Sequence, residues 1–79
     1  MAEEYYTRHM ESTKLVVEID READGRWIAD VPELPGVMVF AETREAALAK
    51  VKVLALRVLA DRLEHGEVVP ALSGLFDAA

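Results

Sequence analysis

The feature that most constrains the fold is an unbroken helix-forming run between residues 44 and 64. This run contains no glycine or proline, and most of its residues are Ala, Leu, Val, Lys, Arg and Glu. Thr43 can cap the first helical turn, and Gly66 suits the position just beyond a helix end. The sequence therefore predicts one helix of roughly 21 residues, about 31 Å long at 1.5 Å per residue.

On a helical wheel, this helix carries two apolar stripes. The first is a broad arc, wide enough to cover a sheet, formed by Ala47, Leu48, Val51, Leu54, Ala55, Val58 and Leu59. The second has the 4-3-4-3 spacing of a helix–helix contact and is called the helix seam: Ala49, Val53, Leu56, Ala60 and Leu63. One sheet cannot cover both stripes. We expect the helix seam to bind a second copy of the chain; the alternative is that it packs under the terminal segments, through Tyr5, Tyr6, Leu72, Leu75 or Phe76.

Three strands are predicted before the helix. Residues 14–20 and 26–31 alternate on two faces, and the Asp24-Gly25 turn dipeptide lies between them, which predicts a hairpin. Residues 37–41 are apolar on both faces, which is typical of a strand inside a sheet and covered on both sides. Residues 67–76 could supply a short fourth strand. The predicted class is α+β: a three-stranded antiparallel sheet with one long helix packed on it and a short fourth strand.

The second and third strands are joined by VPELPGV, residues 31–37. Its turn consists of Pro32, Glu33, Leu34, Pro35 and Gly36. Proline fixes φ and lacks a backbone donor, so neither proline suits a central strand, and glycine can adopt a positive φ. This stretch predicts a rigid corner between strands rather than a loop that holds a ligand.

Composition favours a single small domain that associates with other proteins. The 79 residues include no cysteine, so no disulfide can reinforce a thin core. Hydrophobic residues make up 52% of the chain, a surplus that favours self-association, and the net charge of −6 favours basic partners over nucleic acid. We expect a domain over residues 14–76, a tail over 77–79, and either a short helix or a mobile tail over 1–13.

No targeting, membrane or catalytic motif is visible in the sequence. The N-terminal MAEEYY lacks an apolar core, and no apolar run approaches the roughly 20 residues of a membrane span, so we expect a cytoplasmic protein. Phosphate-binding loops and nucleophile elbows are absent. His65, with Asp61 and Glu67 nearby, is an incomplete metal-ligand set and is better explained by the helix dipole. We expect no cofactor, no metal and no enzymatic activity.

Carboxylates gather around the predicted hairpin. They are Asp20, Glu22, Asp24, Asp30 and Glu33. A general acid–base pair among them is the less favoured interpretation, and a solvated acidic rim is the favoured one.

Residues 24–37, DGRWIADVPELPGV, resemble the signature of HicB-like antitoxins. In that family a hairpin with an aromatic second strand leads into a P-E/D-L-P-G turn, a third strand and a helix that begins at Thr. The family also shows a G-E-x-x-P segment after the helix, which is similar to residues 66–70 here. The resemblance covers about residues 14–70.

The resemblance implies a β-β-β-α-β domain of partial ribonuclease-H-like type. It also implies a partner, a small basic HicA-type toxin that cleaves RNA and that the antitoxin binds and blocks. The exposed sheet edge and the hairpin are the two candidate surfaces for it, because strand edges invite pairing, and the sequence does not choose between them. The catalytic histidine of that system belongs to the toxin, so no catalytic residue is carried over. The 13 residues after Gly66 are too few for the DNA-binding domain of many members, so we expect a stand-alone member without direct DNA or RNA binding.

An alternative function remains open beside the antitoxin. The chain could be a homo-oligomeric structural or regulatory protein without a toxin, binding another protein or a small molecule.

Overall fold

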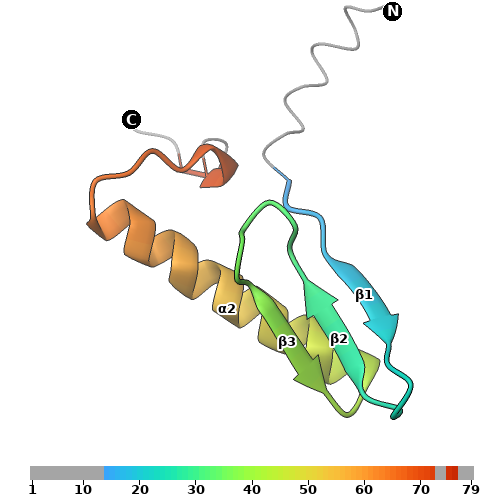
Figure 1. Ribbon diagram of the computed structural model, residues 1–79. Coiled ribbons are helices and arrows are strands. Elements are labelled where there is room, and N and C mark those ends of the chain that lie inside the picture. The colour runs from blue at the N-terminus through green and yellow to red at the C-terminus, as the bar shows by residue number, and fades with distance from the viewer. Residues whose placement is uncertain (1–13, 73–74, 77–79) are drawn as a thin grey trace, which may run out of the picture.

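The computed structural model describes residues 14–72 and 75–76. Its elements are β1 (Glu18–Arg21), β2 (Trp27–Asp30), β3 (Met38–Ala41), α2 (Arg44–Glu64) and the 3₁₀ helix η2 (Pro70–Leu72). The strands form an antiparallel sheet in the order β1-β2-β3, and α2 lies along one face of it (Figure 1). The predicted α+β class is confirmed. The expectations for residues 1–13 and 77–79 fall outside the described residues.

The β1–β2 hairpin closes through the predicted Asp24-Gly25 turn. The Gly25 N–H donates to the Glu22 carbonyl oxygen (N···O 2.9 Å), and the Glu22 N–H donates to the Arg26 carbonyl oxygen (2.7 Å). Gly25 has φ of +93°, a left-handed conformation that glycine adopts without steric cost. A turn followed by such a residue is a common three-residue hairpin loop.

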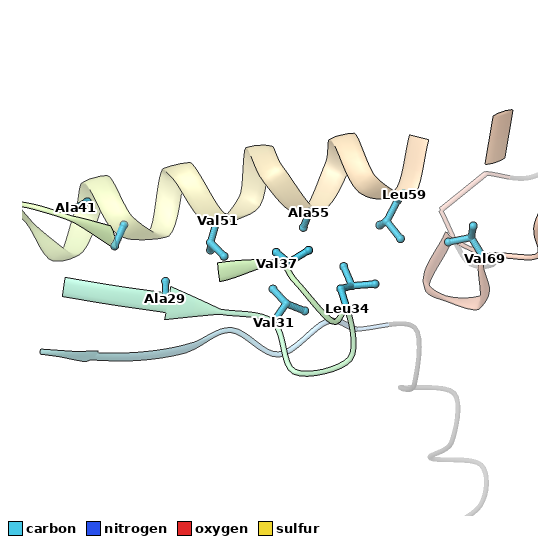
Figure 2. Close-up of a cluster of buried hydrophobic side chains, with 10 residues drawn as sticks. Ala29, Val31, Leu34, Val37, Ala41, Val51, Ala55, Leu59 and Val69 are labelled. Atoms are coloured by element: carbon cyan, nitrogen blue, oxygen red, sulfur yellow. The ribbon is translucent and has the colours of Figure 1, made fainter. Parts of the chain in front are cut away.

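The corner between β2 and β3 consists of two consecutive β-turns. The Leu34 N–H donates to the Val31 carbonyl oxygen (2.9 Å), and the Val37 N–H donates to the Leu34 carbonyl oxygen (3.0 Å). A proline occupies the second position of each turn, and Gly36, with φ of +92°, occupies the third position of the second turn. The apolar residues of the corner, Val31, Leu34 and Val37, are at most 4% exposed (Figure 2).

Local signals fix both ends of α2. The Thr43 Oγ1 accepts a hydrogen bond from the Ala46 N–H (3.1 Å) at the first turn. At the other end Gly66 has φ of +80°, its N–H donates to the Leu63 carbonyl oxygen, and the Glu67 N–H donates to the Arg62 carbonyl oxygen. This is the Schellman pattern of a helix C-terminus, and the helix has the predicted bounds.

Small side chains build the core between the sheet and α2 (Figure 2). Ala29 and Ala41 from the sheet face a buried row on the helix whose members are four residues apart: Ala47, Val51, Ala55 and Leu59. Leu54 and Val58 belong to the same predicted arc, but they are only partly buried and lie beside this row. A contact that follows one such row is typical of a helix that crosses the surface beneath it at an angle.

The prediction that residues 37–41 form an internal strand is wrong. β3 is an edge strand, and its outward side chains Met38 and Phe40 are 51% and 36% exposed. The short hairpin and the short corner make sequential strands neighbours, which gives β2 the central position. The apolar outer face of β3 is therefore not explained by burial within the described part of this chain.

No fourth strand forms in the described part of residues 67–76, and the ribonuclease-H-like detail is not confirmed. The segment folds instead into η2, in which the Leu72 N–H donates to the Val69 carbonyl oxygen (3.0 Å). Pro70 begins this turn, where its missing N–H has no consequence, and Val69 is 9% exposed and joins the core.

No described helix is long and apolar enough to cross a membrane.

Truncating the buried leucine of the corner tests its structural role. We expect Leu34→Ala to lower the free energy of unfolding by about 2–4 kcal/mol, because it leaves a cavity at the end of the core. Urea unfolding followed by circular dichroism measures this change. Glu33→Ala, at the exposed neighbour, is the control and should stay within about 0.5 kcal/mol. Equal midpoints for the two variants would contradict a structural role for the corner.

Candidate functional site

One candidate binding surface is the sheet face that points away from α2. Side chains alternate along each strand, so this outer sheet face is defined by Glu18, Asp20, Arg26, Ile28, Asp30, Met38 and Phe40. The strand pairing arranges the strand residues in two rows, Glu18–Asp30–Met38 and Asp20–Ile28–Phe40. In Figure 1, α2 covers only the opposite face of the sheet.

The outer sheet face is acidic on one side and apolar on the other. Towards β1 the surface has a hollow of about 360 Å³. Four members of the outer sheet face line this hollow together with Ile19 and Glu22; the four are Glu18, Asp20, Ile28 and Asp30. Towards β3 lie Met38 and Phe40, of which Met38 is about half exposed and Phe40 about one third exposed. Carboxylates beside exposed apolar side chains suit a partner that is itself basic and carries apolar groups.

Arg26 is the one basic member of the outer sheet face, and Asp24 holds it in place. The Arg26 guanidinium lies 4.5 Å from the centre of the Phe40 ring, a cation–π distance. Its Nε donates to the Asp24 Oδ2 (2.8 Å), and the Arg26 backbone N–H donates to the Asp24 Oδ1 (3.0 Å). Both hydrogen bonds lower the pKa of the Asp24 carboxyl group, and the one from the Arg26 backbone N–H has the larger effect. The Asp24 carboxylate compensates the positive charge of Arg26, so the outer sheet face remains acidic overall.

The free edge of β3 is partly closed. The Val31 N–H donates to the Val37 carbonyl oxygen, so by alternation the peptide groups of Met38 and Phe40 point towards the free edge. There the Lys50 Nζ donates to the Phe40 carbonyl oxygen at 2.9 Å. A lysine at an edge strand disfavours pairing with another strand. The β3 edge of the sheet is therefore poorly suited to strand pairing with a partner; the other edge strand is β1.

The helix seam is the second candidate surface, and no described residue covers it. Val53, Leu56 and Leu63 are 49%, 60% and 49% exposed, and Ala49 and Ala60 are exposed as well. The structure brings the five residues together along the side of α2 that does not carry the buried row.

The described terminal residues proposed as a cover for the helix seam do not provide one. Leu75 and Phe76 are 62% and 74% exposed, and Leu72 packs against the core. Tyr5 and Tyr6 lie outside the described residues. A shallow groove of about 390 Å³ runs beside the seam towards β3, lined by Val39, Ala49, Lys50, Val53, Leu54 and Arg57.

The residues considered for metal binding and catalysis have ordinary surroundings. The His65 Nδ1 lies 2.8 Å from the Asp61 carbonyl oxygen, the helix-end contact that the sequence suggested, and 3.5 Å from the Asp61 Oδ1. Within residues 14–72 and 75–76, no three or more His, Asp or Glu side chains are grouped to hold a metal. Trp27 packs against the core on the helix side of the sheet.

Sequence reasoning missed the outer sheet face as a unit. The available signals were Ile28, which lies between Arg26 and Asp30 on the polar face of its strand, and the apolar Met38 and Phe40 on the second face of residues 37–41. For residues 37–41 the pattern predicts an internal strand, whereas the structure leaves Met38 and Phe40 exposed at the edge strand. The helix seam, in contrast, is predicted from its spacing, and the structure leaves its five residues exposed; its pairing stays a prediction.

The comparison with protein-family models finds no match for this chain, and the comparisons with curated proteins and with solved structures find none either. Function must therefore be inferred from the sequence resemblance and from the two surfaces.

The lowered pKa of Asp24 predicts a pH-dependent contribution to stability. A carboxyl group whose pKa is lower in the folded state stabilises that state above the unfolded pKa, about 3.9, and the stabilisation is lost as the pH falls through the folded value. We expect Asp24→Asn to lower the urea midpoint at pH 7 and to match the unaltered chain near pH 2. Glu22→Gln, with the same charge change in the same loop, is the control. A difference that persists at pH 2 would contradict an ionic origin.

Proposed function

We propose that this chain is a protein-binding module that neutralises a small, basic, RNA-cleaving toxin of HicA type by binding it directly. The observation that carries this proposal is the dual use of β2, the strand of the signature-like stretch. Along β2 and its two flanking residues, Trp27, Ala29 and Val31 contribute to the core, while Arg26, Ile28 and Asp30 contribute to the outer sheet face. The family-like stretch thus supports the fold and offers a surface for a partner.

Electrostatics supports a basic partner on the outer sheet face. The chain carries a net charge of −6, which attracts a positively charged protein over distance and speeds encounter. A protein that cleaves RNA needs basic groups to hold phosphates. Carboxylates such as Glu18, Asp20 and Asp30 can occupy those same basic groups, so that RNA is excluded. In this proposal the chain performs no catalysis, needs no cofactor and acts in the cytoplasm.

A second candidate function is favoured by the exposed helix seam. The chain would then be a homo-oligomeric structural or regulatory protein that has no toxin and binds another protein or a small molecule. Self-association is expected under both functions, so it does not separate them. Binding of a basic partner does separate them.

Charge reversal on the outer sheet face tests the antitoxin proposal. The chain is co-expressed with the basic HicA-type protein from a neighbouring reading frame, and affinity is measured by calorimetry, with RNA cleavage as a second readout. We expect Asp20→Lys/Asp30→Lys to weaken binding roughly tenfold or more, because like charges then face each other, and to restore RNA cleavage.

The matched control is Glu33→Lys/Glu67→Lys, which makes the same charge change at exposed residues outside the outer sheet face. Its binding should stay within a few-fold of the unaltered chain. An equal loss in both variants would show that overall charge acts rather than this face. A complete lack of binding to any basic neighbour would overturn the antitoxin function.

A further inference from the structure

We infer that two copies of this chain pair through their helix seams in antiparallel orientation. The seam from Ala49 to Leu63 covers about 21 Å of helix at 1.5 Å per residue, and none of its five members is charged. Three of its side chains are about half exposed or more. Apolar stripes of this spacing are normally covered by another helix, and α2 is the only helix of more than three residues that the structure describes.

A second copy fits the helix seam because the charges beside the seam complement themselves. Lys50, Arg57 and Glu64 are seven residues apart and follow one flank of the seam. In an antiparallel pair this flank meets the same flank of the other copy in reverse order. Lys50 of each copy then faces Glu64 of the other, which gives two attractive contacts. The one like-charge approach, between the two Arg57 side chains, lies at the solvated margin, where long side chains can separate.

A parallel pair is less favourable on two grounds. Opposite flanks would meet, so that Lys52 of each copy would lie beside Arg57 of the other and Glu45 beside Lys50. The two repulsive contacts then offset the two attractive ones, whereas the antiparallel pair has a net attraction. Each seam residue would also lie beside its own counterpart, with Ala49 against Ala49 and Ala60 against Ala60, which leaves gaps. Antiparallel helices can place each alanine beside a larger side chain of the other copy, as close packing requires.

The pairing has a consequence for partner binding that rests on the proposed function. The helix seam and the outer sheet face lie on different sides of the molecule. The buried row of α2 faces the sheet and the seam lies on another side of the helix, while α2 covers only the inner face of the sheet (Figure 1). A pair joined through α2 therefore leaves both outer sheet faces free. The dimer presents two partner sites and forms a complex of two chains with two toxins.

Two substitutions in the helix seam test the pairing. We expect the unaltered chain to have the mass of two chains in multi-angle light scattering, and Val53→Glu/Leu56→Glu to have the mass of one. The control is Val68→Glu/Leu75→Glu, at residues that are 87% and 62% exposed but lie outside α2. This control should keep the mass of two chains. An unaltered chain with the mass of one chain, or a dimeric seam variant, would overturn the pairing.

A spin-label distance tests the orientation. The chain has no cysteine, so Glu45→Cys, at an exposed residue outside the helix seam, can carry the single nitroxide of each copy. Antiparallel helices centred near Leu56 separate the two labels by roughly 20 Å or more along the helix axis, whereas parallel helices place them about 10 Å apart. Electron paramagnetic resonance distinguishes these distances, and the short distance would overturn the antiparallel arrangement.

The same measurements separate this inference from the proposed function. A dimer that binds no basic protein would overturn the antitoxin function and leave the pairing intact. A monomer that binds the toxin one to one would overturn the pairing and leave the antitoxin function intact.

Discussion

The close contact between small residues of α2 and the sheet is the constraint on which the rest of the structure depends. Alanines lie on both sides of this contact, Ala29 and Ala41 below and Ala47 and Ala55 above, so the helix can approach the strands closely. A larger side chain at any of these positions would lift the helix away from a core that has few other layers to compensate. The double turn around Leu34 extends the same contact towards the C-terminal end of α2. The Leu34 side chain is buried in the core near Leu59 (Figure 2).

This geometry explains why so much apolar surface remains exposed. One helix on one sheet gives a two-layer domain with two uncovered outsides, and the chain places apolar residues on both. Phe40 and Met38 lie on the outer face of the sheet, and Leu56 and Val53 lie on the side of α2 that does not face the sheet. Exposed patches of this kind on a small protein usually mark contacts with other proteins. The 52% hydrophobic content is thus divided between a thin core and two outer surfaces.

Features that depend on local chemistry could be predicted from the sequence, and features that depend on distant packing could not. Thr43 and Gly66 set the ends of α2, and Gly25 and Gly36 set the turns, because caps and positive φ angles are decided by a few neighbouring residues. The helix seam was identifiable because its spacing lies within one element. The position of β3 at the edge was not identifiable, since a strand that is apolar on both faces shows that both faces need cover but not what covers them.

Lys50 connects the sheet edge with the helix seam. Its ammonium group donates to the Phe40 carbonyl oxygen at the free edge of β3, and its stem flanks the seam beside Ala49. Edge-to-edge pairing of β3 would have to displace this lysine from the Phe40 carbonyl oxygen, whereas seam pairing does not use the backbone groups of β3. At the β3 edge this lysine disfavours strand pairing, whereas the helix seam carries no charged side chain. Closed pairing through α2 is also compatible with a partner on the outer sheet face, because neither contact needs the backbone groups of the strand edge.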